Sequence, residues 1–447
     1  MPDPTQRRLR LYDDTPKTGD DRSDFQRDRD IVLYTTALQR LSGITQVASG
    51  ETGHVFHNRL THTLQVAQVG RRLAEKLGLK QKEMVESYGG ISPDVVEAAC
   101  LAHDLGHPPF GHLAESVLNK MAGELAGGFE GNAQSFRIVT ELAFRSEAYN
   151  GLNLTWQTLE AILKYPWTFA GRPDKSTKKW GAYDSEIAPF RHATGQDGPG
   201  PVRRSPAAEI MDWADDLTYA IHDIEDFYRA GIVPLHALRP PESGSAPDAE
   251  RSRFLDYVCA RKHKIEPLAR LSPAEIDEIF GNLLLAYFSL DKPYEGTRDD
   301  RARLRSFTSN LVGRYINGLK LEEPSEGQKS VSIDPGHECE IAILKQLTWC
   351  YVIEAPALAV QQHAQKQVIK TLFSVFMHET RADPSRLLPA YYRERLMLIK
   401  KEQEDYTIPA KRMVVDLIAG MTEYQALSLY QRLHGITQSS AIDRVLV

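Results

Sequence analysis

The stretch Ala102-His103-Asp104-Leu105-Gly106-His107-Pro108-Pro109-Phe110-Gly111-His112 carries three histidines and an aspartate directly after an apolar run. Ser92 and Pro93 have the residue types of a helix N-cap and first turn. The apolar run that follows predicts a buried helix, which Gly106 and the two prolines end. Burying an adjacent histidine and aspartate is costly unless something compensates them. A divalent cation would do so, since both are common metal ligands; a core histidine hydrogen-bonded to a carboxylate is the alternative.

Composition limits the class of protein. The chain has 447 residues, 42% hydrophobic and 26% charged, as expected for one large or two ordinary globular domains. The net charge of −6 gives no support for general nucleic-acid binding, although it does not exclude a local basic patch. The four cysteines form no metal or disulfide pattern. No signal peptide or membrane-spanning segment is recognised, so we expect a cytoplasmic protein.

A second histidine lies in a comparable apolar setting. A helix is predicted from about residue 58 to 77, and His62 shares one face of it with Val66, Val69 and Leu73. A histidine in this position is either a hydrogen-bonded core residue or a metal ligand. The presence of His103 in another apolar helix favours the ligand.

Two further patterns supply carboxylates. His112 and Glu115 are three residues apart, hence neighbours on a helix, and form a candidate acid–base pair. On a helix predicted from about residue 206 to 230, Asp215, Tyr219 and Asp223 recur every four residues and share one side. Alone, these acidic residues indicate a solvated face. Beside the histidines, one aspartate would complete a four-ligand metal site.

The chain divides into three parts. Residues 1–24 are polar and charged and are expected to form a mobile tail. Residues 25–235 are predicted to form a helical core carrying the metal site, with an irregular basic loop at 166–205 that suits either a flap over phosphates or a linker. Residues 236–447 are predicted to form a helical C-terminal region packed on the core and involved in oligomerisation. No strand pair is recognised, so the predicted fold class is all-α.

Longer blocks of sequence resemble the deoxyguanosine-triphosphate triphosphohydrolase (dGTPase-like) family, within the HD superfamily of metal-dependent phosphohydrolases. The resemblance extends over about residues 22–435 and implies an HD-domain helical core with a helical C-terminal subdomain. The matching blocks are Arg59-Leu60-Thr61-His62, residues 103–112, FEGNAQ at 129–134, Gly151-Leu152-Asn153-Leu154-Thr155, Ala214-Asp215-Asp216 through Asp223, and Ile418-Ala419-Gly420-Met421-Thr422.

The resemblance assigns roles to matching positions. It implies four metal ligands: His62, His103, Asp104 and Asp215. The catalytic group would be His107, His112 and Glu115. Five positions match substrate contacts to sugar or phosphate: Gln46, Arg59, Asn132, Tyr219 and Asp223. Asp215 is preferred to Asp216 as ligand because of its family spacing to Tyr219 and Asp223.

The implied reaction splits a dNTP into a deoxynucleoside and tripolyphosphate, with dGTP expected from the family name and other dNTPs left open. One divalent ion per subunit would act as Lewis acid at the α-phosphate. His112, oriented by Glu115, would move a proton as acid or as base. The family favours Mn²⁺, then Mg²⁺, while ligand type also suits Fe²⁺, Co²⁺, Ni²⁺ or Zn²⁺.

Two other functions stay open. One is an HD-type nucleotidase or phosphodiesterase, which would not release tripolyphosphate. The other is a catalytically silent HD protein that binds dNTPs or nucleic acid as a regulator. The family also includes homo-oligomers, chiefly hexamers and tetramers, and members that a second dNTP activates; both properties are expectations from the resemblance alone.

Overall fold

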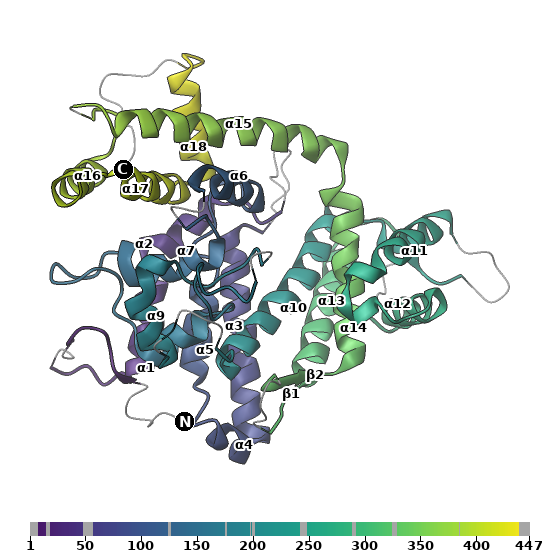
Figure 1. Ribbon diagram of the computed structural model, residues 1–447. Helices are drawn as coiled ribbons and strands as arrows, with labels where there is room; N and C mark the ends of the chain where they lie inside the picture. Colours follow the sequence, from purple (N-terminus) through teal and green to yellow (C-terminus); the bar gives the residue numbers. More distant parts are fainter. Residues whose placement is uncertain are drawn as a thin grey trace.

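The computed structural model describes residues 8–14, 18–47, 57–123, 127–174, 177–196, 198, 202–241, 248–287, 292–323, 329–383 and 385–437. These residues form eighteen α-helices and two short strands (Figure 1). The prediction of an all-α fold is confirmed.

The helices of the first half pack around a central group of three, α3, α5 and α10. Their bounds are α1 Asp24–Leu33, α2 Thr36–Arg40, α3 Arg59–Lys80, α4 Lys82–Ser87, α5 Pro93–Ala102, α6 His112–Ala122, α7 Gly131–Arg137, α8 Trp156–Ile162, α9 Ile187–Thr194 and α10 Pro206–Arg229. The π-helical turn η4 (Ile138–Leu142) continues α7, and the 3-10 turn η5 (Asp184–Glu186) precedes α9.

The second half adds two groups of helices. The first group, beside α10, is α11 Ala249–Arg261, α12 Pro273–Tyr287, α13 Arg298–Asn317 and α14 Pro335–Thr348. The second group is α15 Pro356–Glu379, α16 Ala390–Glu402, α17 Thr407–Ala419 and α18 Glu423–Leu433. The π-helical turn η9 (Trp349–Ile353) joins α14 to the region of α15, which crosses above α6 in Figure 1.

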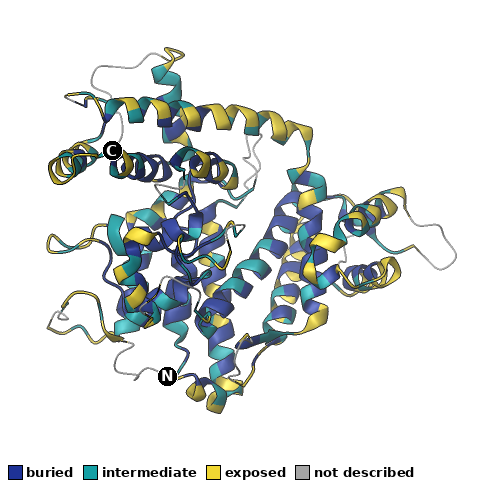
Figure 2. Cartoon of the chain, viewed as in Figure 1, coloured by how far each residue is buried: buried dark blue, intermediate teal, exposed yellow. Residues whose placement is uncertain are grey.

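The apolar side chains form two main cores. The larger core unites α3, α5 and α10 with α11–α14, and the ribbons of α5 and α10 are mostly dark blue in Figure 2. The second core unites α6 with α15–α18. Phe110, 9% exposed, packs in this second core although it lies between His107 and His112 in sequence. The loop carrying these histidines therefore lies where the two cores meet.

The structure corrects the prediction of no strand pair. Strands β1 (Leu319–Leu321) and β2 (Val331–Ile333) pair antiparallel. Three-residue strands are too short to show a clear alternation in sequence. A tertiary contact also supports the pair, because the backbone amide of Val331 donates to the carboxylate of Glu209 on α10, 2.8 Å away.

Three local expectations also differ from the structure. The predicted irregular loop at 166–205 contains η5 and α9. His103 and Asp104 follow α5 rather than lying in it, with His103 as its C-cap. Of the predicted tail 1–24, Arg10 is anchored: its side chain is 6% exposed and lies 2.7 Å from buried Asp28. Residues 1–7 and 15–17 of that tail lie outside the described residues.

Among the described residues, no single helix has the length and apolar character needed to cross a membrane. One pair of helical segments, Pro335–Ile353 and Pro356–Glu379, reaches that length and composition only when taken together, and it is bent by 74°.

Candidate functional site

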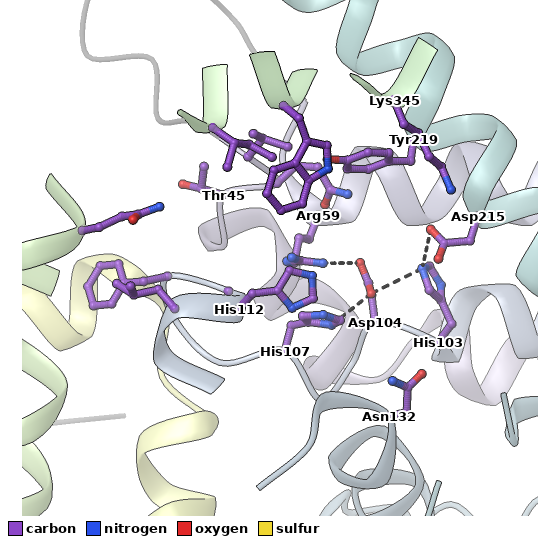
Figure 3. A pocket seen from close by; sticks show the side chains of 18 of the residues that line it. Thr45, Arg59, His103, Asp104, His107, His112, Asn132, Asp215, Tyr219 and Lys345 are labelled. Carbon is purple, nitrogen blue, oxygen red and sulfur yellow. Dashed lines mark hydrogen bonds and ion pairs between the residues drawn. The ribbon is translucent and has the colours of Figure 1, made fainter. Parts of the chain in front are cut away.

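A cavity of about 500 Å³ lies between α3, α6, α10 and the segment from α14 to α15 (Figure 3). Nine of the twelve predicted site residues line it: Gln46, Arg59, His103, Asp104, His107, His112, Asn132, Asp215 and Tyr219. His62, Glu115 and Asp223 are buried beside the cavity and are not among its lining residues. We call His62, His103, Asp104 and Asp215 the cavity floor.

Local structure positions the two floor histidines. A capping box between Asn58 and Thr61 starts α3, so that His62 is on its first turn. The imidazole Nδ1–H of His103 donates to the carbonyl oxygen of Cys100, 2.6 Å away, and thereby satisfies a carbonyl at the end of α5. This bond leaves Nε2 of His103 directed at the floor carboxylates.

The loop after α5 lies against α7. A Cβ atom at Gly106 would lie 2.1 Å from the carbonyl oxygen of Gly131, so only glycine allows this approach. The Gly106 amide donates to the hydroxyl of Ser135, which donates in turn to the carbonyl of His103. These contacts fix the backbone on both sides of Asp104.

The floor offers a compact set of metal donors. One ligand atom each from His62, His103 and Asp215 lies within 4.8 Å of the others. His62 Nε2 is 3.1 Å from Asp215 Oδ1, and His103 Nε2 is 3.6 Å from the same oxygen. Among the described residues, His103 Nε2 is buried and makes no hydrogen bond. An unpartnered imidazole nitrogen directed at a carboxylate fits a divalent cation.

Asp104 lies at the edge of this group. Its Oδ1 is 3.4 Å from His103 Nε2 and 3.0 Å from His107 Nδ1, while its Oδ2 accepts a 2.6 Å hydrogen bond from Arg59. Figure 3 shows Asp104 between these three partners. One carboxylate oxygen of Asp104 therefore faces the histidines, and the other is held by the guanidinium of Arg59.

The electrostatics of the floor favour positive charge. Burial lowers the pKa of His103, but Asp104 and Asp215 outweigh it and raise the pKa to about 9. Burial raises the pKa of Asp215, yet Lys164 and His103 hold it well below its usual range. Burial, with Arg59, lowers the pKa of His107 to about 4, so this imidazole is neutral near pH 7. The two ionised carboxylates of the floor attract a cation.

His112 and Glu115 form a second polar group, on the first turn of α6. His112 Nδ1 lies 2.9 Å from Glu115 Oε2, and the His112 side chain is 75% exposed while Glu115 is buried. Lys179 donates to Glu115 and to buried Glu130, at 2.8 Å each. Burial raises the pKa of Glu115, but His112 and Lys179 hold it well below its usual range. The exposed imidazole thus has an ionised, positioned carboxylate behind it.

Three lysines and a tryptophan from distant segments surround the cavity; we call Lys164, Lys179, Lys345 and Trp349 the cavity rim. Lys164 Nζ lies 2.6 Å from Asp212 and 3.4 Å from Asp215. Lys345 Nζ lies 2.6 Å from Asp216. Asp216, the neighbour of the preferred ligand, is therefore paired with Lys345 rather than with the floor.

The predicted substrate contacts differ in their surroundings. The carboxamide oxygen of Gln46 is buried and, within the described residues, makes no hydrogen bond. The carboxamide nitrogen of Asn132 donates to Glu130, 2.8 Å away. Burial raises the pKa of Asp223 well above its usual range, and neighbouring Asp226 raises it further. Gln46 has free acceptor capacity at the cavity, whereas Asp223 lies behind Tyr219.

Sequence reasoning did not assign roles to Lys164, Lys345, Trp349 or Glu423, all of which line the cavity. Lys179 was noted only as part of a basic loop. Nothing in the local sequence distinguishes these residues from other surface side chains. Their placement depends on packing between segments that lie far apart in the chain.

Comparison with known families agrees with this architecture. The HD domain model matches residues 59–220, and the phosphohydrolase-associated domain model matches residues 331–432. The helical core and its His/Asp group thus define an HD-domain phosphohydrolase, a class whose members bind divalent metal ions.

Relatives of nearly full length give the family. The deoxyguanosinetriphosphate triphosphohydrolase-like protein of Streptomyces coelicolor is 37% identical over 441 residues, covering 95% of this chain and 96% of the relative. Proteins of the same name from Corynebacterium efficiens and Shewanella pealeana are 33% and 31% identical, covering at least 96% of each chain. The chain belongs to the deoxyguanosinetriphosphate triphosphohydrolase-like family, so the resemblance seen in its sequence is confirmed.

Proposed function

We propose that this phosphohydrolase cleaves dNTPs, dGTP among them, to the deoxynucleoside and tripolyphosphate in a reaction that depends on a divalent metal. The observation that carries the proposal is the combination of a buried His62–His103–Asp215 donor group with a cavity of about 500 Å³ lined by four cationic side chains. The names of the relatives support the same substrate class.

The rim and Arg59 would hold the phosphate chain. Lys164, Lys179 and Lys345 line the cavity from three separate segments of the chain, and each is already paired with a carboxylate. Burial lowers the pKa of Lys164 and Lys179, but their carboxylate partners outweigh it, so both remain protonated. Protonated lysines beside a cavity attract a polyanion.

The His112–Glu115 pair would move the proton. The 5′-oxygen of a deoxynucleoside is a poor leaving group, so protonating it as the bond to phosphorus breaks lowers the barrier. Glu115 would fix the tautomer of His112 through Nδ1, leaving Nε2 to face the reacting atoms. Whether His112 gives the proton to the 5′-oxygen or takes it from water stays a prediction to test.

The floor residues would hold the metal through imidazole nitrogen and carboxylate oxygen. Such an ion, for which we propose Mn²⁺ first, supplies Lewis acidity at a phosphate oxygen. The second oxygen of Asp104 stays with Arg59, which places this guanidinium beside the floor and within reach of a bound phosphate.

The test is product analysis. Purified protein is incubated with Mn²⁺ and each dNTP, singly and together, and the products are separated by anion-exchange chromatography. We expect deoxynucleoside and tripolyphosphate, with no turnover in excess EDTA. Turnover only in the mixture would support the effector expectation from the family.

Other products would overturn the proposal. Release of a nucleoside monophosphate with pyrophosphate, or turnover confined to monophosphates or cyclic nucleotides, would assign the site to the nucleotidase or phosphodiesterase alternative. Absence of turnover under every condition, with dNTP binding retained, would assign a regulatory role.

Assembly is part of the same proposal. We propose a homo-oligomer, either a tetramer or a hexamer of the 50.3 kDa chain. Light scattering after gel filtration measures the mass directly, and a monomeric mass would reject this part alone.

A further inference from the structure

The turn at 420–423 joins α17 to α18. It overlaps the block 418–422, which resembles the family but has no role in the function proposed above. Glu423 is the first residue of α18, and it belongs to the region matched by the phosphohydrolase-associated domain. Its carboxylate nevertheless contacts two segments of the first half of the chain, at Thr45 and at Phe110.

The first contacted segment carries Gln46. Glu423 Oε1 accepts a hydrogen bond from the backbone amide of Thr45 at 3.0 Å, and Oε2 accepts one from the Thr45 hydroxyl at 2.7 Å. Gln46, with its buried carboxamide oxygen, is the next residue. The carboxylate therefore fixes the backbone directly before a predicted substrate contact.

The second contacted segment precedes His112. Glu423 Oε1 also accepts a hydrogen bond from the backbone amide of Phe110, 3.2 Å away. Phe110 has a φ of +68°, which is uncommon for a bulky side chain, and Gly111 has a φ of +58°. Such a conformation persists only where surrounding contacts impose it. Here the contacts are the Glu423 carboxylate and the second core, in which the phenyl ring is buried.

Neighbouring contacts reinforce the same connection. Arg40 donates to the carbonyl oxygens of Met421, Leu105 and His107, at 3.0, 2.7 and 2.8 Å. Gly43 lies against Thr422, since a Cβ at Gly43 would lie 2.8 Å from the Thr422 methyl. The turn at 420–423 is thus connected to Leu105 and His107 through Arg40, and to Phe110 through Glu423.

We propose that Glu423 is a positioning residue through which the C-terminal region holds His112 and Gln46 in place. It acts through the backbone of Phe110 and Thr45 and takes no part in proton transfer. Its effect on turnover rests on the function proposed above, whereas its effect on backbone order does not.

Hydrogen exchange measured by mass spectrometry tests this order directly. In Glu423→Ala we expect amides in peptides covering 44–47 and 105–113 to exchange about tenfold faster or more, with α3 peptides unchanged. Glu423→Gln should restore protection, because its carboxamide oxygen can accept from both amides and its nitrogen can donate to the Thr45 hydroxyl. Glu404→Ala, at an exposed position of the same region, is the matched control and should change neither segment.

A second variant guards against general unfolding. Thr45→Val removes only the hydroxyl contact. We therefore expect faster exchange in 44–47 and an unchanged exchange rate in 105–113. Unchanged exchange in both segments of Glu423→Ala, or equally faster exchange across α3, would overturn the proposal. So would failure of Glu423→Gln to restore protection.

Turnover provides the second readout. Provided that the wild type hydrolyses dNTPs, Glu423→Ala should lower kcat by roughly 10- to 100-fold at unchanged metal content, while Glu423→Gln stays within about threefold. Unchanged kcat in Glu423→Ala would remove the catalytic part of the proposal. If the wild type hydrolyses no dNTP, the proposed function fails, and the exchange experiment still decides whether Glu423 positions the two segments.

Discussion

The floor and the rim of the cavity differ in how the chain builds them. The side chains of His62 and His103 are 2% and 6% exposed; His62 lies on the first turn of α3, and His103 is the C-cap of α5. Those of Lys179 and Lys345 are 37% and 25% exposed and come from a loop and from α14. Three floor side chains, those of His62, His103 and Asp104, are desolvated, whereas Asp215 and the rim lysines keep 19–37% of their side-chain surface exposed. Each rim lysine is also paired with a carboxylate.

This difference separates two tasks. Buried metal ligands that helix packing already holds in place can bind a cation without a further loss of side-chain entropy. Hydrated lysines on separate segments can exchange carboxylate partners for phosphate oxygens. Floor substitutions should therefore remove metal and activity together, whereas rim substitutions should leave the metal in place.

The largest expected effect is at the floor. His103→Ala removes the imidazole nitrogen that faces Asp104 and Asp215, and we expect loss of bound metal and turnover below detection. Metal content by mass spectrometry and dNTP hydrolysis measure the two effects. His263→Ala, at an exposed position, is the matched control. Full metal occupancy in His103→Ala would contradict the assigned floor.

The next largest effect is expected at His112, which belongs neither to the floor nor to the rim. His112→Ala removes the exposed imidazole beside Glu115 and should lower turnover by at least ~10²-fold while metal content stays that of the wild type. The pH profile of kcat should lose one limb, and its side identifies the acid or base role. Near-normal turnover in a metal-loaded variant would exclude His112 from the mechanism.

A smaller effect is expected at Lys179. Lys179→Met removes the cation shared by Glu115 and Glu130, leaving two carboxylates without their common partner. We expect a fall in kcat smaller than that of His112→Ala, and about 1 kcal/mol less unfolding free energy. Lys179→Arg should recover part of both. A loss of metal in Lys179→Met would contradict the expectation that rim substitutions leave the metal bound at the floor.

The last expected effect is on folding stability alone, with no change in turnover, and concerns a buried histidine that lies outside the floor. Burial, with nearby His57, lowers the pKa of His222 from 6.5 to about 3. As the pH falls, His222 is protonated in the unfolded chain before it is protonated in the folded one. The neutral, buried His222 therefore makes its full contribution to the unfolding free energy above pH 6.5, and this contribution is lost as the pH falls towards 3. Urea unfolding at pH 7 and pH 5 should show the wild type losing up to about 2 kcal/mol more than His222→Gln. Equal losses would contradict a neutral, buried His222.

The helices that carry the floor were predictable from local sequence patterns, whereas the set of four ligands came from the resemblance to the family. His62 and Asp215 lie on helices whose apolar stripes and start signals are regular: Asn58 caps α3, and Ser205 caps α10. The exception is Asp104. Its place in the sequence does not show that Arg59 and His107 occupy its oxygens, since this depends on how α3 meets the loop after α5.

The rim and the positioning contacts were not predictable in the same way. Lys345 lies 130 residues after Asp215 of the floor, and Glu423 lies 313 residues after Phe110 of the loop that it contacts. Their sequence surroundings resemble those of ordinary helix positions, and no periodic pattern indicates which side faces the cavity. Only packing between the two cores brings them to the site.

The measurement that tests the central claim most directly is hydrolysis of dGTP in ¹⁸O-labelled water with Mn²⁺, followed by mass spectrometry of both products. We predict unlabelled deoxyguanosine and one ¹⁸O atom in tripolyphosphate, as attack of water at the α-phosphorus requires. Label in a nucleoside monophosphate or in orthophosphate, or no turnover of any dNTP, would contradict a floor and rim that together cleave a deoxynucleoside triphosphate.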